Sequence, residues 1–255
     1  MTDFRLAGVH VPRIGLGTNR LTTASPHPAF VRDAVAAGVR HIDTAHLYSG
    51  GDSERAIGDA LDGASEDVLV ATKGGYAGAG QGRPEVLHAQ IEQSLRSLRT
   101  RAIGLYYLHR VDPETPLEES LGAIKAHVDR GEIRHVGVSE VSVEQIERAQ
   151  RVVPIAAVQN RYSLADRRHD DVVDFCTREG IAFVPYFPLR GDGGPRVAAA
   201  AERLGVTEST VRLAWLLQRS PVVLPIPGTL SLEHLRENLA ALELQLDDET
   251  VRSFA

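Results

Sequence analysis

Short apolar runs alternate with longer amphipathic segments along most of the chain. Each run is apolar at nearly every position and rich in valine and isoleucine, which is typical of strands covered on both faces in a parallel sheet. The segments between the runs place apolar residues three and four positions apart, which predicts helices. The eight runs occupy residues 13–18, 39–45, 67–73, 103–109, 133–139, 155–160, 181–186 and 222–227.

The predicted helices follow these runs in regular order. Several of them end at a glycine, such as Gly180 and Gly205, as expected where the backbone becomes left-handed after the last turn. Residues 4–12 precede the series and have the pattern of a β-hairpin. The helical segments are 28–38, 53–63, 84–98, 116–131, 142–152, 169–180, 196–205, 207–219 and 231–242.

Eight strand–helix units in 255 residues predict a single α/β domain over residues 1–255. The expected fold is a (β/α)8 TIM barrel with a short N-terminal β-hairpin. The rival is a doubly wound open sheet, which carries a glycine fingerprint at its first strand–helix turn. The segment GLGTNR (15–20) lacks the third glycine of that fingerprint. The glycine-rich stretch 74–82 fits neither the dinucleotide nor the Walker spacing, and we interpret it as a mobile loop.

Composition and charge narrow the class of protein. The formal net charge is −6 and no long block of Lys or Arg occurs, so neither a nucleic-acid partner nor an anionic membrane is expected. The only cysteine, Cys176, excludes an intrachain disulfide and fits a reducing compartment. No signal peptide or membrane span is apparent. These features predict a cytoplasmic protein.

Polar side chains recur where successive strand runs end. Asp43, Lys73, His109, Ser139, Gln159 and Tyr186 follow one another at intervals of 20 to 36 residues, each about one strand–helix unit. The carboxyl ends of all barrel strands open on the same face, where active sites of this fold are built. Residues that are distant in sequence are therefore expected to meet at one mouth.

Four of the polar residues suggest proton transfer to an oxygen. A phenol has a pKa of about 10 in water, and a neighbouring ammonium makes it a stronger acid. Tyr48 could be that phenol, with Lys73 as the ammonium and Asp43 keeping the lysine charged. His109 could then donate a hydrogen bond to a carbonyl oxygen. Because no nucleophile with a matching base is evident, carbonyl reduction with an external hydride source is the best fit.

The strand-end motifs resemble those of the aldo-keto reductase family. GLGT, HIDTAHLY, VATK, YYLH, VGVS, VQNRYS, PYFPL and PIPGT occur in the family's order over nearly the whole chain. The resemblance implies an NADPH-dependent oxidoreductase that reduces an aldehyde or ketone to an alcohol. It implies Tyr48 as general acid, Lys73 and Asp43 as the groups that tune it, and His109 as the residue that orients the carbonyl. A monomer is the common state in the family.

The resemblance also implies an extended nicotinamide cofactor across the barrel mouth. Ser139 and Gln159 would bind its carboxamide, Tyr186 would stack on its ring, and a helix N-terminus would lie near the adenosine end. The implied cofactor-binding residues are Gly17, Thr18, Asn19, Asp43, Ser139, Gln159, Tyr186, Phe187, Pro188, Leu189, Arg190, Ile226, Pro227, Gly228, Thr229, Ser231, His234, Glu237 and Asn238.

Two departures from the family pattern affect specificity. Many NADPH-specific members have lysine at the position of Gly228 and arginine at that of His234. The IPGT motif resembles a branch in which some members still use NADPH, so NADPH is the expected cofactor and NADH is possible. In the substrate pocket, formed by Asn19, Tyr48, His109 and Arg110, two tryptophans of aromatic-pocket relatives are replaced by Asn19 and Arg110. An open, polar site for bulky or polar carbonyls is expected, although Arg110 could instead pair with Asp112.

Two other functions compete with the reductase. His41, Asp43 and His46 could bind a metal in a barrel hydrolase, but a lysine ammonium near them would repel a divalent ion, so no metal is expected. Alternatively, the chain could be a nicotinamide-binding auxiliary or sensor subunit with little turnover, because a fold does not fix a function.

Overall fold

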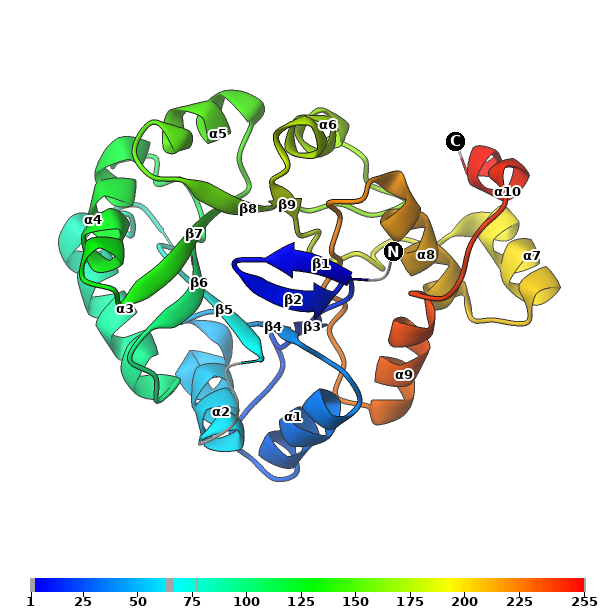
Figure 1. Ribbon diagram of the computed structural model, residues 1–255, viewed down its shortest axis with the longest axis horizontal. Coiled ribbons are helices and arrows are strands. Elements are labelled where there is room, and N and C mark those ends of the chain that lie inside the picture. The colour runs from blue at the N-terminus through cyan, green and yellow to red at the C-terminus, as the bar shows by residue number, and fades with distance from the viewer. Residues whose placement is uncertain (1–2, 63–66, 77, 255) are drawn as a thin grey trace.

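The computed structural model describes residues 3–62, 67–76 and 78–254 and shows a barrel of parallel strands inside a ring of helices (Figure 1). Seven strands pair in chain order, each parallel to the next. This order confirms the predicted barrel and excludes the doubly wound sheet. The strands are β3 (Leu16–Gly17), β4 (His41–Asp43), β5 (Leu69–Gly74), β6 (Ile103–Leu108), β7 (Ile133–Ser139), β8 (Ile155–Gln159) and β9 (Ala182–Phe183).

The eighth predicted strand, residues 222–227, is not a regular strand. The segment and the adjoining Gly228 lie between β9 and β3. They contact both through isolated parallel bridges, Phe183 with Val223 and Gly17 with Gly228. Its carbonyls still accept hydrogen bonds, since Gly15 N donates to Pro225 O at 3.0 Å. Pro225 and Pro227 have no N–H to donate, so the ladder cannot be continuous. The segment closes the barrel without forming a full strand.

The helices follow the predicted order and lie outside the sheet. Gly180 and Gly205 end α6 and α7 in the left-handed conformation, as expected. A further helix, α10 (Asp248–Ser253), was not predicted. The others are α1 (His27–Ala36), α2 (Asp52–Leu61), α3 (Pro84–Ser97), α4 (Leu117–Asp129), α5 (Val143–Gln150), α6 (Asp170–Glu179), α7 (Gly194–Leu204), α8 (Glu208–Arg219) and α9 (Leu232–Ala240).

The predicted hairpin is formed by β1 (Asp3–Leu6) and β2 (Val9–Pro12), which pair antiparallel. It lies across one end of the barrel (Figure 1). Leu6 and Val11 are fully buried there and pack in one cluster with Leu105 inside the barrel. A second, larger cluster fills the space between the sheet and the surrounding helices. Among the described residues, none of the helices has the length and apolar character needed to cross a membrane.

Candidate active site

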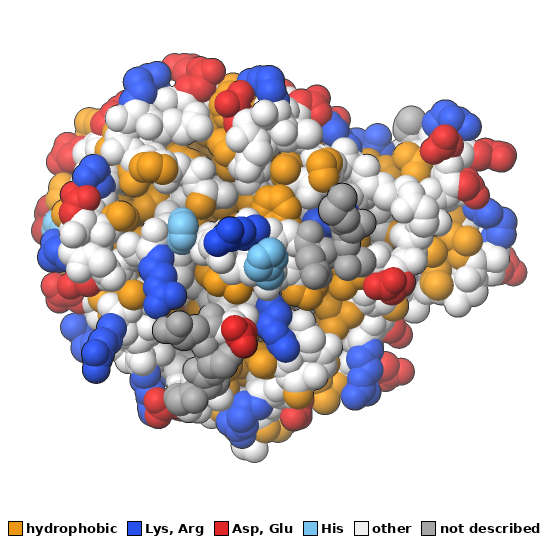
Figure 2. Space-filling model, in the orientation of Figure 1, with side chains coloured by type: hydrophobic (Ala, Val, Ile, Leu, Met, Phe, Trp, Pro, Cys, Tyr) orange, Lys and Arg blue, Asp and Glu red, His pale blue; other side chains and the backbone are white. Residues whose placement is uncertain are grey.

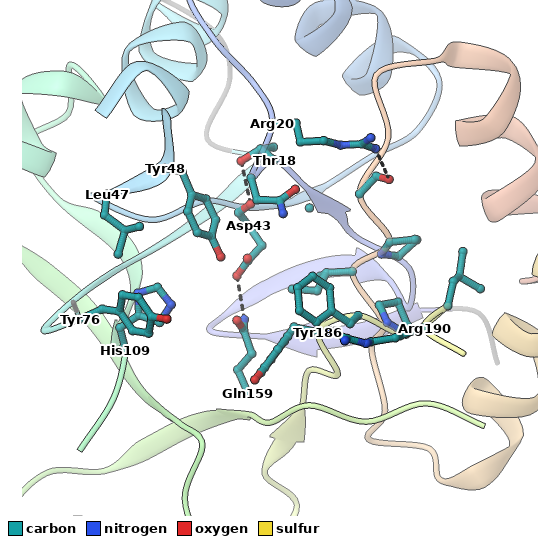
Figure 3. Close-up of a pocket in the computed structure, with 18 of the residues that line it drawn as sticks. Thr18, Arg20, Asp43, Leu47, Tyr48, Tyr76, His109, Gln159, Tyr186 and Arg190 are labelled. Carbon is teal, nitrogen blue, oxygen red and sulfur yellow. Dashed lines mark hydrogen bonds between the residues drawn. The ribbon is translucent and has the colours of Figure 1, made fainter. Parts of the chain in front are cut away.

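The four candidate catalytic residues meet at the barrel end opposite the hairpin. Figure 3 shows Asp43, Tyr48 and His109 there, and Lys73 is bonded to Asp43. Asp43 ends β4 and Lys73 lies near the end of β5, while His109 follows β6 directly. The backbone N–H of His109 donates to Gly74 O at 2.7 Å, which continues the ladder to the histidine. Parallel pairing thus places side chains from three strands at one mouth, as the spacing predicted.

Tyr48 does not lie on a strand but begins a short 3-10 turn, Tyr48–Gly51. Three residues after Tyr48 have positive φ: Ser49 at 50°, Gly50 at 64° and Gly51 at 89°. Glycine adopts this conformation without steric cost, so the GG pair lets the chain reverse towards α2. The reversal leaves the Tyr48 ring facing the mouth (Figure 3).

Asp43 and Lys73 form a buried ion pair. Lys73 Nζ donates to Asp43 Oδ1 at 2.6 Å and to the carbonyl of Thr44 at 2.7 Å, and Lys73 has no exposed surface. Burial lowers the pKa of Lys73, but the charge of Asp43 and the contact with Tyr48 outweigh it, so the pKa ends above its usual value. The lysine is therefore a permanent cation at neutral pH.

The ammonium of Lys73 lies beside the phenol of Tyr48. Its nitrogen is 5.1 Å from the centroid of the Tyr48 ring. A fixed cation here stabilises negative charge on the phenol oxygen when a proton leaves it. The ring of His109 faces the same phenol edge-on, with the ring centroids 6.1 Å apart. A carbonyl oxygen can thus contact both residues at once.

His109 is a neutral imidazole. It is only 6% exposed, and its Nδ1 has no hydrogen-bond partner among the described residues. Burial, reinforced by the charges of Lys73 and Arg110, lowers the pKa of His109 to about 2. At physiological pH the ring therefore has one N–H donor and no charge, which suits hydrogen bonding to a carbonyl.

A cavity of about 740 Å³ begins at these residues and extends along the strand ends. Most of the predicted cofactor and substrate residues line it, and three residues that were not predicted line it too: Arg20, Leu47 and Tyr76. The predicted lining residues are Gly17, Thr18, Asn19, Asp43, Tyr48, His109, Arg110, Gln159, Tyr186, Phe187, Pro188, Leu189, Arg190, Ile226, Pro227 and Gly228.

The remaining predicted residues do not line this cavity. Lys73 and Ser139 are buried, and each bonds to a residue that lines it, Asp43 and Arg110 respectively. Ser231 caps α9 by accepting a hydrogen bond from His234 N at 3.3 Å, and its own N–H donates to Thr229 Oγ1 at 3.0 Å. Thr229, Ser231, His234, Glu237 and Asn238 therefore lie at or on α9, next to Gly228 at the far end of the cavity.

Two paired residues at the ends of β7 and β8, Ser139 and Gln159, match a carboxamide. Gln159 donates from Nε2 to Asp43 Oδ2 at 2.8 Å, which leaves its carbonyl oxygen as an acceptor. Ser139 accepts a hydrogen bond at Oγ, which leaves its O–H as a donor. One donor and one acceptor side by side are what a nicotinamide carboxamide requires, so these residues fit the implied cofactor.

The far end of the cavity fits the cofactor's phosphates. A Cβ on Gly17 would lie 2.7 Å from Ile226 O, so only glycine permits the close chain packing that forms this part of the floor. Arg20 and Arg190 line the same end, and neither has an acidic partner within the described parts of the chain. Two unpaired guanidinium groups provide the positive charge that a pyrophosphate needs.

Arg110 lies in the cavity wall and does not pair with Asp112. It donates to His109 O at 2.6 Å, Ser139 Oγ at 3.0 Å and Tyr186 Oη at 3.2 Å. The pairing with Asp112 that the sequence left open is therefore not formed, and Arg110 lines the cavity.

Asp112 instead anchors the glycine-rich loop. Its carboxylate accepts hydrogen bonds from Gly80 N at 3.1 Å and Gly82 N at 2.6 Å, and from Thr115 Oγ1 at 3.1 Å. The stretch 74–82, interpreted as mobile, is therefore fastened at two of its described residues.

The alternative metal site is not formed. Both oxygens of Asp43 are engaged, by Lys73 and by Gln159. His41, Asp43 and His46 do not come together as a group that could hold a metal ion, and neither does any other set of three His, Cys, Asp or Glu among residues 3–62, 67–76 and 78–254.

Comparison with known proteins identifies the family. The aldo/keto reductase family model matches residues 13–195 and 194–255. An uncharacterized oxidoreductase of Schizosaccharomyces pombe is 38% identical over 83% of this chain and 72% of its own length. Pyridoxine 4-dehydrogenase of Escherichia coli is 35% identical over 97% of this chain and 95% of its own length.

Solved structures give the same result. A thermostable aldo-keto reductase in complex with the inhibitor epalrestat has 32% identity and a TM-score of 0.90, covering 100% of this chain and 98% of that one. An aldo/keto reductase of Klebsiella pneumoniae in complex with NADP and acetate has 29% identity and a TM-score of 0.89, covering 99% and 94%. The chain belongs to the aldo/keto reductase family. The expected fold and the expected enzyme class, a nicotinamide-dependent aldo-keto reductase, are confirmed.

Proposed function

We propose that this enzyme reduces an aldehyde or ketone to an alcohol with NADPH, using Tyr48 as the general acid. The observation that carries the proposal is the buried Lys73–Asp43 pair next to Tyr48, with the neutral His109 facing the same phenol. The ammonium of this pair has no exposed surface, so it is fixed beside the phenol from which the proton leaves.

Each residue has a distinct part in the reaction. When bound, the nicotinamide supplies the hydride. The N–H of His109 and the O–H of Tyr48 hold the carbonyl oxygen and polarise the C=O bond. Hydride addition at carbon places negative charge on this oxygen, and Tyr48 transfers its proton there. Lys73 stabilises the phenolate that remains, and Asp43 keeps Lys73 charged.

The cofactor choice rests on the hydroxyl groups of Thr229 and Ser231 next to Gly228, which could hydrogen-bond the 2′-phosphate that only NADPH carries. Arg20 and Arg190 provide positive charge for the pyrophosphate, which NADPH and NADH share. Related structures from Klebsiella pneumoniae contain NADP or NADPH. We expect kcat/KM for NADPH to exceed that for NADH, and equal values would contradict the preference. NADH remains a possible second cofactor.

A panel of carbonyl compounds with both cofactors tests the function directly. 4-Nitrobenzaldehyde is a suitable reporter, and pyridoxal belongs in the panel because of the Escherichia coli relative. We expect NADPH oxidation that requires the carbonyl, with bulky or polar substrates better than small unbranched aliphatic aldehydes. Tight NADPH binding without turnover would instead favour the sensor-subunit alternative. A monomer in the cytoplasm is our prediction for its native state, and light scattering of the purified protein measures the first part.

A further inference from the structure

We propose that Arg110 binds a carboxylate of the substrate, and that the preferred substrates are carbonyl compounds in which an aromatic or apolar body carries that carboxylate. The inference rests on the proposed function and specifies its substrate class. It depends on four observations: how Arg110 is held, what it lacks, where it lies and what surrounds it.

Arg110 is held in place by neutral groups. Three hydrogen bonds, to His109 O, Ser139 Oγ and Tyr186 Oη, use both terminal nitrogens. The guanidinium carbon also lies 5.2 Å from the ring centroid of Tyr76 and 5.5 Å from that of Tyr186. Because a guanidinium has five N–H donors, two remain, one of them on Nε. The Arg110 guanidinium is therefore fixed in orientation and still has two N–H donors for a ligand.

The positive charge of Arg110 has no acidic partner. No ion pair joins it to an Asp or Glu in the described parts of the chain. Glu140 contacts the phenol of Tyr186, and it accepts a hydrogen bond from Arg161 N at 2.6 Å. Burial raises the pKa of Tyr186 to about 12, so a neutral phenol separates the carboxylate from the guanidinium. A half-buried cation without a counter-ion attracts an anion.

The position of Arg110 assigns this anion to the substrate. The cavity contains three arginines without acidic partners, and two of them, Arg20 and Arg190, lie with Gly228 and Leu189 at the end expected to bind the cofactor's phosphates. Arg110 is adjacent to His109, at the end where the carbonyl reacts. The remaining cation, Lys73, is neutralised by Asp43. A negative group near Arg110 is therefore supplied by the molecule whose carbonyl contacts Tyr48 and His109.

The surroundings of the cavity define the rest of the substrate. Leu47, Tyr76 and Phe187 are 37%, 41% and 47% exposed, and they are the large hydrophobic side chains that the described chain exposes most. All three line this cavity. Tyr76 also covers His109, with ring centroids 4.7 Å apart. An apolar body placed between these side chains removes them from water. These apolar side chains around Arg110 fit a substrate that has an aromatic or branched apolar part and one carboxylate.

The test compares two substrates of nearly the same shape. 4-Carboxybenzaldehyde and 4-nitrobenzaldehyde both carry a planar group with two oxygens, but only the first is an anion. The quantity measured is the ratio of their kcat/KM values, in wild type and in Arg110→Met, at saturating NADPH. Loss of a charge-assisted contact lowers this ratio by about 10–100-fold. Arg110→Lys keeps the charge but loses the planar group that can bind a carboxylate through two nitrogens, so it gives an intermediate ratio. It serves as the second variant if Arg110→Met is unstable.

Arg190→Met is the matched control at the other end of the cavity. It raises KM for NADPH and leaves the substrate ratio unchanged, whereas Arg110→Met leaves KM for NADPH within about threefold of wild type. An unchanged ratio in both Arg110 variants, or an effect of Arg110→Met on NADPH alone, overturns the inference. Turnover of the nitro compound with no activity on the carboxylate overturns it while the proposed function stands. Absence of turnover on every carbonyl removes the proposed function as well.

Discussion

At the hairpin end of the barrel the interior is closed by apolar side chains, whereas at the opposite mouth the strands end in buried charged and polar groups. Leu6 and Val11 fill the first end and need no specific partner. Asp43 and Lys73 are equally buried at the second, and each depends on the other. The space-filling view of the hairpin side (Figure 2) shows charged side chains scattered over the surface with apolar patches between them. One barrel therefore separates an apolar end from the end that carries the proposed reaction.

The difference teaches where stability and activity are expected to be coupled. Burying apolar surface is favourable wherever it occurs. Burying an ion pair costs desolvation that the attraction only partly repays, so such a pair is weak evidence for stability. We therefore assign the buried charges at the mouth to the proposed reaction. A mutation at the hairpin end should leave activity unchanged, and a mutation at the mouth should lower stability only where it leaves a buried charge unpaired. The following predictions test this separation.

Tyr48→Phe should have the largest effect, on activity alone. It removes the proton donor and keeps the ring, so we expect kcat to fall by about 10²–10⁴-fold, the usual contribution of a general acid. The melting temperature and the Kd for NADPH should stay close to those of wild type. Steady-state kinetics and cofactor fluorescence titration measure these quantities. Near wild-type turnover would show that another group delivers the proton.

Lys73→Met should affect both properties, because the charge left on Asp43 is buried. We expect a loss of about 3–5 kcal/mol in the free energy of unfolding, together with nearly complete loss of turnover. The double variant Lys73→Met with Asp43→Asn removes the orphaned charge and should recover most of the stability but none of the activity. Denaturant titrations of the three proteins provide the measurement. Equal stability of the single and double variants would contradict the ion-pair argument.

Leu6→Ala is the corresponding change at the hairpin end. The side chain is fully buried, so truncation should destabilise the protein by about 2–4 kcal/mol. Since no catalytic group contacts it, kcat at 25 °C should be unchanged. A fall in kcat at a temperature where the variant is fully folded would mean that the hairpin controls the mouth.

The smallest effect concerns pH and the buried His41 of β4. Neither nitrogen of its ring has a hydrogen-bond partner in the described structure, and burial lowers the pKa of His41 to about 4. The unfolded chain takes up this proton near pH 6.5, so the unfolded state binds more protons below that value and stability falls as the pH decreases from 6.5 to 4. His109 contributes in the same direction.

His41→Leu should therefore reduce the loss of stability on acidification by up to about 3 kcal/mol at pH 4. The exposed His10→Gln is the matched control. Thermal unfolding of the three proteins between pH 7 and pH 4 measures the difference. Parallel curves for wild type and His41→Leu would show that His41 is not the acid-sensitive group.

Much of the fold follows from the sequence because buried parallel strands leave a continuous apolar signal. The apolar pattern wrongly predicted a regular strand at residues 222–227. The composition there is that of a strand, but Pro225 and Pro227 prevent a continuous hydrogen-bond ladder. The pattern also missed α10, whose six residues are too few for a periodic pattern, although Asp247 accepts from Thr250 N at 2.7 Å as a helix cap does.

The site was predictable only where strands carry it. Asp43, Lys73 and His109 are placed by strand ends, so their spacing indicated their meeting point. Tyr76 lies in a glycine-rich stretch with no periodicity, and its position over His109 depends on contacts distant in sequence. The hydrogen-bond partners of Arg110 could not be predicted from the sequence either, because Ser139 and Tyr186 come from other strand–helix units.

The carboxylate of Asp112 joins two pieces of the pocket that are otherwise separate in the chain. Through Gly80 and Gly82 it ties the loop that bears Tyr76 to the segment that bears Arg110. The distance between the Tyr76 ring and the Arg110 guanidinium is therefore held constant. To change the substrate specificity of this enzyme, residues 75–82 and 110–115 should be exchanged together. Replacing either segment alone removes the hydrogen bonds from Gly80 and Gly82 to Asp112.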